Sequence, residues 1–70
     1  MSLIFRRHAA RRLVERYLSE HDVMLTIAFP DSLEEQKRGI MVSRKTLGLK
    51  HVTVVWHRDE RGNHVVHTVI

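Results

Sequence analysis

The last twenty residues of the chain, 51 to 70, alternate between apolar and polar positions. This alternation predicts a β-hairpin whose two faces differ in chemistry. The apolar face would carry Val52, Val54, Trp56, Val66 and Ile70. The other face would carry His51, Thr53, Val55, His57, Val65 and His67. Because an apolar face must be covered and a polar one can stay in water, we expect the first to lie in the core and the second to be open to a ligand or partner.

Residues 59–63 separate the two predicted strands and favour a type I turn with Gly62 in the left-handed region. This turn fixes three expected cross-strand pairs: Trp56 with Val66, Val54 with Thr68, and Val55 with His67. A shift of one residue would exchange the two faces, so the face assignment depends on the turn.

Two helices are predicted upstream of the hairpin. In residues 7–18 the apolar side chains recur at helical spacing and would form one face, made of Ala10, Leu13, Val14, Tyr17 and Leu18. Ser19 and Asp22 predict a capping box at the start of a second helix, and Pro30 ends that helix. Because residues 23–29 are apolar almost all round, this helix is either covered on both sides or meets another chain. The second case would give a homodimer through residues 23–29.

The remaining segments complete a sheet. Residues 3–6 are short and apolar-led, as in an edge strand, residues 31–38 are polar and predict a loop, and residues 40–46 alternate as in a strand. A turn at 47–50 leads into the hairpin. The order of strand, helix, helix and three strands predicts a single α+β domain over residues 1–70. We expect a small antiparallel sheet, made of a short N-terminal strand and three C-terminal strands, with two helices packed on one face.

The charge of the chain indicates an anionic partner. Lys and Arg total 12 and Asp and Glu total 8, giving a net charge of +4, and six histidines can add charge below neutral pH. Nucleic acid or an acidic protein would suit this charge, and an ordinary basic surface would also account for it. The chain has no cysteine for disulfides or thiolate metal sites. It has no apolar stretch typical of a signal peptide or a membrane span, so we expect a cytoplasmic protein.

Short sequence patterns run along nearly the whole chain. They are H-A-x-x-R-L-x-x-R at 8–16, L-S-x-x-D-V at 18–23, F-P-D at 29–31, K-x-x-G at 45–48, V-T-V-V at 52–55 and T-V-I at 68–70. Together they resemble a prokaryotic domain-of-unknown-function family that is grouped with the RelE- and BrnT-type toxins of toxin–antitoxin systems. The resemblance implies a RelE-like fold. For the wider group it also implies ribonucleases that cut messenger RNA, many of them on the ribosome, and that an antitoxin holds inactive.

The uncharacterised branch need not share that activity, because a fold does not fix a function. RelE-type toxins use scattered Lys, Arg, Tyr or His side chains without a short fixed motif. The resemblance therefore carries over only to the positions that match the pattern of the branch: His8, Arg12, Arg16 and Lys45.

RNA cleavage without a metal needs a base for the ribose 2′-OH, an acid for the leaving 5′-oxygen, and cations for the phosphorane. His57 and His67 would lie diagonally on neighbouring strands, within about 7 Å at Cβ, and suit the acid–base pair. The expected catalytic residues are His57, His67 and Lys45. The expected residues for RNA or phosphate binding are His8, Arg12, Arg16 and Arg44.

Most of these residues also have an ordinary structural explanation. The two strand histidines can be simple exposed residues, and His8 can hold the turn between strand and helix by hydrogen bonding. Arg12 and Arg16 can form a solvated helix side. The histidines lack the tight spacing of a metal site, and neither a metal nor another cofactor is expected.

Three functions remain open from the sequence, one of which is salt-sensitive binding of nucleic acid without cleavage. Of the other two, the first is a RelE- or BrnT-like toxin-type protein that binds RNA and acts as a metal-independent mRNA endoribonuclease, on the ribosome or away from it, with an antitoxin as partner. The alternative is a small non-catalytic binding or adaptor domain that works through protein–protein contact or dimerisation. The small core and the apolar second helix favour this alternative.

Overall fold

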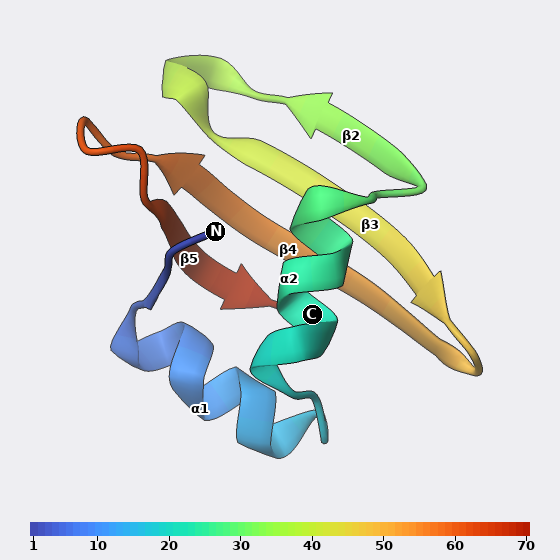
Figure 1. The fold of residues 1–70 in the computed structure, drawn as a ribbon. Helices are drawn as coiled ribbons and strands as arrows, with labels where there is room; N and C mark the ends of the chain where they lie inside the picture. Colours follow the sequence, from blue (N-terminus) through green and yellow to red (C-terminus); the bar gives the residue numbers. More distant parts are fainter.

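A computed structural model describes all 70 residues of the chain (Figure 1). In chain order the elements are β1 (Leu3–Phe5), α1 (Arg7–Glu15), α2 (Glu20–Ala28), β2 (Ser32–Glu35), the 3₁₀ turn η1 (Lys37–Gly39), β3 (Met41–Leu47), β4 (Lys50–Arg58) and β5 (His64–Val69). The predicted α+β class is confirmed. No helix is both long enough and apolar enough to cross a membrane.

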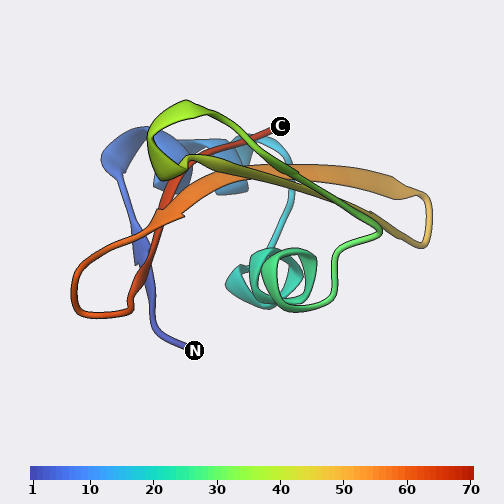
Figure 2. The same ribbon diagram turned by 90° about the horizontal axis from the view of Figure 1, so that it is seen from above.

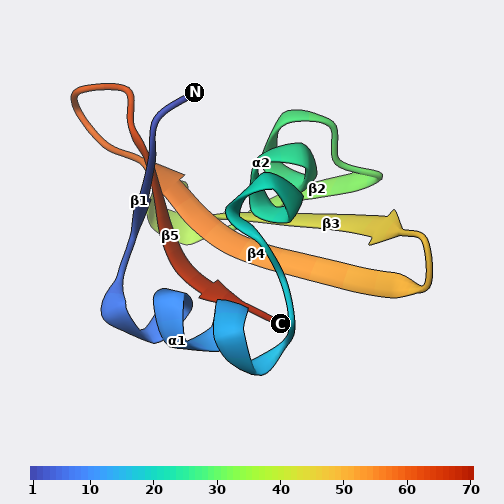
Figure 3. The same cartoon turned by 60° about the horizontal axis from the view of Figure 1, so that its bottom comes forward.

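The five strands form one mixed sheet in the order β1-β5-β4-β3-β2. The strands from β2 to β5 are antiparallel to their neighbours, whereas β1 runs parallel to β5 and pairs Leu3 with His64 and Phe5 with Val66. Figure 3 shows β1 alongside β5. The prediction of a purely antiparallel sheet is therefore wrong. A three-residue strand carries no pattern that fixes its direction, and the helical connection between β1 and the other strands permits a parallel pairing.

Both helices pack on the same side of the sheet. One core cluster joins α1 and α2 to strands β4 and β5, and its members are Ala9, Leu13, Val23, Ile27, Val52, Val54, Trp56, Val66 and Val69. In Figure 1, α2 lies in front of β3 and β4 while α1 lies below β5, and Figure 2 shows α2 to one side of β3 and β4. We call the covered side of the sheet the inner face.

Helix α1 is shorter than predicted and turns a different side toward the sheet. It ends before Tyr17, which adopts a left-handed conformation with φ of 54°. Ala9 and Leu13 are buried, whereas Val14 is 78% exposed and Tyr17 86% exposed. The predicted apolar face, which included Ala10, therefore holds only for Leu13 and for Leu18, which is half-buried and packs against the core cluster. The helical period was visible in the sequence, but packing against β5 decides which side of the helix is buried.

Helix α2 begins and ends as predicted. The Ser19 hydroxyl accepts a hydrogen bond from the Asp22 N–H at 3.1 Å, and the Asp22 carboxylate accepts one from the Ser19 N–H at 3.0 Å. Pro30 follows the last turn, which ends at Ala28. The apolar side chains of this helix are divided between a buried side on the core and half-buried Met24 and Leu25.

Strand β2 lies where the sequence predicts a loop. It pairs with β3 and places Leu33 opposite Ser43 and Glu34 opposite Val42. All four of its residues are exposed. An edge strand of this kind is held by backbone hydrogen bonds rather than by burial, so its polar sequence does not reveal it.

A β-bulge in β5 changes the register of the hairpin. Trp56 lies opposite Val66, as predicted, but the next pair is Val55 with Thr68. His67 is therefore an additional residue without a partner on β4, and the predicted pairs beyond Trp56 are wrong by one position. Alternation of residue types cannot show such an insertion before the register is known.

The bulge also changes which of the last residues enters the core. Val69 is fully buried beside Val66, whereas Ile70 is 55% exposed. Val69 thus takes the inward position that the sequence predicts for Ile70. A fully buried valine contributes about 1.5–3 kcal/mol relative to an exposed one, so this exchange keeps the C-terminal strand attached to the core.

The other side of the sheet is free of helices, because every buried apolar residue of α1 and α2 belongs to the core cluster. We call it the outer face. The pairing of the strands assigns to it Ile4, Ser32, Glu34, Val42, Arg44, Thr46, His51, Thr53, Val55, His57, Val65, His67 and Thr68. The predicted division of the hairpin into an apolar and a histidine-bearing face therefore holds, apart from its last residue.

Candidate functional site

The outer face carries two imidazole rings in direct contact. His57 Nδ1 and His67 Nε2 lie 2.6 Å apart, a short hydrogen bond, and the ring centroids are 4.8 Å apart with an interplanar angle of 47°. One of the two nitrogens donates an N–H and the other accepts through its lone pair. The sequence places these rings on one surface, and the structure brings them into a hydrogen-bonded pair, which we call the histidine pair.

The turn between β4 and β5 fixes the register that brings the rings together. Asp59 Oδ1 accepts hydrogen bonds from the N–H groups of Arg61 and Asn63 at 2.9 and 2.8 Å. These bonds, above all the one from Asn63, lower the pKa of Asp59 below its usual value. Gly62 has φ of 83°, so the predicted left-handed glycine is confirmed.

The bulge places the second ring of the pair. In a regular antiparallel ladder His67 would stand directly opposite Val55. Because the bulge leaves His67 without a cross-strand partner, its ring is free to contact the ring of His57, which is paired with Val65. Bulges commonly redirect a side chain in this way.

Arg6 is a cation beside the pair that the sequence analysis did not identify. Its backbone N–H donates to Val66 O at 3.1 Å, where β1 leaves the sheet. Burial lowers the pKa of His67 below its usual value, and the positive charge of Arg6 and then the ring of His57 lower this pKa further. His67 therefore favours the neutral imidazole. The parallel pairing of β1 with β5 creates this neighbourhood, and no sequence signal indicated that pairing.

Lys45 is separated from the histidine pair by the sheet. It pairs with Val52 in the β3–β4 ladder and so belongs to the inner face. Its Nζ donates to Phe29 O at 2.6 Å and lies 3.6 Å from Asp31 Oδ1. The ammonium group thus satisfies a free carbonyl at the C-terminal end of α2, where a positive charge is favourable.

The three predicted phosphate-binding residues of the first helix region are also not brought to the pair. His8 and Arg16 are exposed, and neither they nor Arg12 hydrogen-bonds with either ring. Arg12 Nη1 lies 3.9 Å from Glu15 Oε1 in a solvent-exposed ion pair, which contributes little to stability. Arg12 and Arg16 thus lie on a solvent-facing side of the helix region, as their structural explanation describes, whereas His8 is exposed and forms no side-chain hydrogen bond that would hold the turn.

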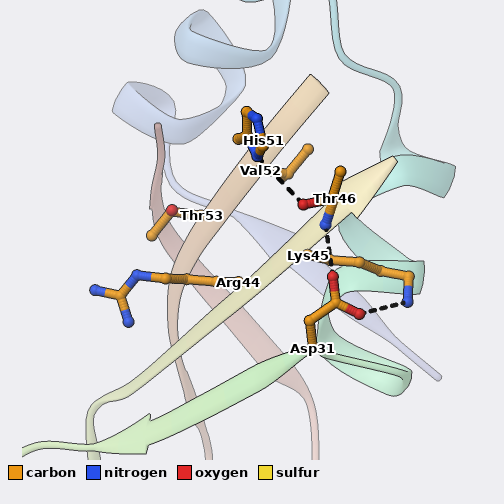
Figure 4. A pocket seen from close by; sticks show the side chains of 7 residues that line it. All are labelled: Asp31, Arg44, Lys45, Thr46, His51, Val52 and Thr53. Atoms are coloured by element: carbon orange, nitrogen blue, oxygen red, sulfur yellow. Dashed lines mark hydrogen bonds and ion pairs between the residues drawn. The ribbon is translucent and has the colours of Figure 1, made fainter. Parts of the chain in front are cut away.

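A second polar group lies farther along the outer face, around the fourth predicted phosphate-binding residue (Figure 4). Arg44 stands opposite Thr53 and Thr46 stands opposite His51 on β3 and β4. Thr46 Oγ1 and His51 Nδ1 are 3.2 Å apart. These four side chains line a hollow of about 240 Å³.

His64 is a buried histidine on the inner face. Its ring centroid lies 5.0 Å from that of Trp56, its Nε2 lies 3.4 Å from Arg58 Nη2, and its Nδ1 has no hydrogen-bond partner. Burial, followed by the charge of Arg58, lowers its pKa, so the ring is held neutral. No three His, Asp or Glu side chains lie together as a possible metal site, with His64 or elsewhere.

Comparison with known proteins adds one finding. The sequence matches the family model described as a domain of unknown function (DUF4258) over residues 5–70. No curated protein and no solved structure matches the chain significantly. The match covers all of the helices and strands except the first part of β1.

Proposed function

The chain belongs to the domain-of-unknown-function family DUF4258, and from its site we propose that it binds RNA on the outer face of the sheet and cleaves it without a metal. The histidine pair would carry the proton transfers. One observation supports this proposal above all: the 2.6 Å hydrogen bond between His57 Nδ1 and His67 Nε2 on a face that no helix covers.

A hydrogen-bonded pair of neutral imidazoles presents a base and an acid at the same time. The ring that donates its proton within the pair keeps a lone pair on its outer nitrogen, and the ring that accepts keeps an outer N–H. The outer nitrogens are His57 Nε2 and His67 Nδ1. Neither is hydrogen-bonded within the protein, and neither is closed off from solvent. The lowered pKa of His67 favours the neutral form of that ring near pH 7.

The proposed reaction uses this asymmetry. The outer lone pair takes the proton of the ribose 2′-OH, and the 2′-oxygen forms a bond to the adjacent phosphorus while the bond from phosphorus to the 5′-oxygen breaks. The bridging proton moves to the second ring, whose outer N–H protonates the leaving 5′-oxygen. The products are a 2′,3′-cyclic phosphate and a free 5′-hydroxyl, and the pair returns to neutral with its roles exchanged.

Two features of the charge support an RNA substrate. Arg6 is close enough to the pair to lower the pKa of His67, and a guanidinium can bind the phosphate whose charge changes during the reaction. The net charge of +4 adds a general attraction for a polyanion. We place Arg6, rather than Lys45, as the cation of this site.

The experiment is a cleavage assay with purified protein and a single-stranded DNA oligonucleotide that contains one ribonucleotide. Because only that position has a 2′-OH, cleavage can occur only there. We expect a 2′,3′-cyclic phosphate at that position. In His57→Ala and in His67→Ala the cleavage rate should fall by a factor of roughly 100 or more. His21→Ala removes an exposed histidine of α2 and serves as the matched control. Cleavage that persists in both pair variants, or no cleavage of naked or ribosome-bound RNA, would overturn the proposal.

The resemblance to RelE- and BrnT-type toxins supports a more specific form of this function. In that form the protein is a toxin whose RNA is messenger RNA, on the ribosome or free, and whose partner is an antitoxin. Expression of the chain should then arrest growth, and His57→Ala should relieve the arrest.

A second candidate is a non-catalytic binding domain. The free edge of β2 favours it, because all four β2 residues are exposed and Leu33, Met41, Trp56 and Arg58 help to line a hollow of about 460 Å³ beside this edge. An extended peptide could add a strand there. A homodimer through residues 23–29 is a further form of this candidate, with Phe29 68% exposed at the end of α2. A strictly monomeric protein that captures no partner would count against both.

A further inference from the structure

The hollow around Arg44 and His51 is a compact block of polar side chains on the outer face. Arg44 and Thr53 form one rung of the β3–β4 ladder, and Thr46 and His51 form a rung two residues along. The block therefore offers a guanidinium, an imidazole and two hydroxyls to the same volume of about 240 Å³. His51 uses Nδ1 toward Thr46 and leaves Nε2 free.

The charges around this hollow leave Arg44 available for a ligand. Its side chain forms no ion pair, while the only carboxylate that lines the hollow is already engaged: Asp31 Oδ2 accepts from the Thr46 N–H at 2.8 Å, and Asp31 Oδ1 lies 3.6 Å from Lys45 Nζ. These two contacts, the first more than the second, lower the pKa of Asp31. Figure 4 shows Arg44 extending away from Asp31 and Lys45, on the side of Thr53.

We propose that this hollow binds a backbone phosphate of the same RNA strand whose cleavage the histidine pair performs, several nucleotides away from the cut. The inference rests on the proposed function and names the class of substrate more closely: a single strand long enough to reach both places. The guanidinium of Arg44 would contact the phosphate oxygens, with His51 Nε2 and the Thr53 hydroxyl as further hydrogen-bonding groups. Contacts to phosphate carry no base preference, so this subsite adds affinity rather than sequence specificity.

The two places are joined along one strand. His51 and His57 are six residues apart on β4, which corresponds to roughly 20 Å in an extended strand. Between them the outer face presents the half-buried Val55, paired with the buried Val42. The outer face therefore leads from the cationic hollow at Arg44, past an apolar place, to the histidine pair. A strand of nucleotides can match this order with phosphates at the ends and an apolar sugar or base surface in the middle.

The test compares Arg44→Gln with Arg11→Gln, which removes the same charge from an exposed position on α1 that has no ion-pair partner. Binding and cleavage are measured on a dinucleotide and on a single-stranded RNA of about ten nucleotides. We expect Arg44→Gln to raise KM for the longer RNA roughly fivefold, as for one lost surface charge contact. The kcat for the longer RNA and the KM for the dinucleotide should not change, because the dinucleotide does not reach the hollow. The slope of log affinity against log salt should fall by about 0.7. His51→Gln should act in the same direction.

Three results separate the possible failures. If the wild-type protein cleaves RNA but Arg44→Gln behaves like Arg11→Gln, the phosphate subsite is overturned and the proposed function stands. If the wild-type protein neither binds nor cleaves RNA, both fall. If an acidic peptide of equal charge binds as tightly as the RNA and depends equally on Arg44, the assignment to an RNA phosphate is overturned.

Discussion

The inner and outer faces of the sheet use the same strands for different purposes. On β4, Val54 and Trp56 point into the core and are buried, while Val55 and His57 alternate with them and are only half-buried. The inner side chains contribute stability by removing apolar area from water. The outer ones are held in position by that stability but contribute less to it. Alternate residues of one strand thus build the core and the open face on which the proposed chemistry would take place.

The two faces also treat a histidine differently. His64 on the inner face is buried beside Trp56, has an unpaired Nδ1, and is held neutral by burial. The rings of the outer pair keep solvent contact and satisfy one another. The buried ring of His64 contributes to packing, whereas solvent-accessible rings such as those of the outer pair are able to exchange protons with a bound molecule.

The largest expected loss of stability comes from a substitution on the inner face. Trp56→Ala would leave a cavity in the core cluster and remove the buried hydrogen bond from Trp56 Nε1 to Ser43 Oγ. We expect a loss of about 3–5 kcal/mol in the free energy of unfolding, comparable with the whole stability of a domain this small. Urea denaturation followed by circular dichroism measures it. Val55→Ala, one residue away on the outer face, is the matched comparison and should lose much less; equal losses would contradict the division into two faces.

A smaller effect on stability distinguishes the structural role of Lys45 from the role proposed for the histidine pair. Lys45→Ala removes the hydrogen bond to Phe29 O and should lower the free energy of unfolding by about 1–2 kcal/mol, since a bond from a charged donor is stronger than a neutral one. His57→Ala, which loses a bond on a half-buried surface, should change stability less. Chemical denaturation of the two variants gives the comparison. If Lys45→Ala keeps full stability and loses RNA cleavage instead, Lys45 belongs to the chemistry after all.

The least disruptive test changes only the pH. In the folded protein the pKa values of His64 and His67 lie below their usual 6.5, so the unfolded chain binds protons more readily. Stability is therefore complete above the unfolded-state pKa and decreases as the pH falls below it, until the folded-state pKa values are passed. Denaturation midpoints measured between about pH 7.5 and about pH 5.5 follow the onset of this decrease before most carboxylates titrate. The decrease should be smaller in His64→Phe, which removes the buried titrating ring; an unchanged pH dependence there would leave His64 out of the effect.

The parts of the fold that the sequence predicted are those that neighbouring residues determine. Ser19 and Asp22 cap α2 by bonds across one turn, and Gly62 adopts the left-handed conformation that its turn requires. The unpredicted parts depend on contacts between distant segments. Packing against β5 decides that Ala9 is buried, and β2 exists because β3 offers it backbone partners. Local patterns do not contain this information.

The candidate site divides in the same way. His57 and His67 could be placed on one surface because alternation and the turn fix the phase of the hairpin. Their direct contact could not be predicted, since it depends on the bulge, which inserts one residue without a compositional signal. Lys45 is expected near them from the sequence because it matches the family pattern and could supply a cation, but the alternation of residues 40–46 does not show which side of that strand faces the helices. The register of β3 on β4 decides that question.

The parallel pairing of β1 with β5 has a consequence for the biosynthesis of the protein. Synthesis proceeds from Arg6 to His67, and at ordinary translation speeds roughly 3–12 seconds separate these two residues. During that interval the nascent chain can form its helices, but β1 has no strand to join. A truncated product that stops before residue 64 lacks β5, and with it the histidine neighbour of Arg6. The arrangement thus couples the synthesis of β5 to the assembly of the imidazole pair.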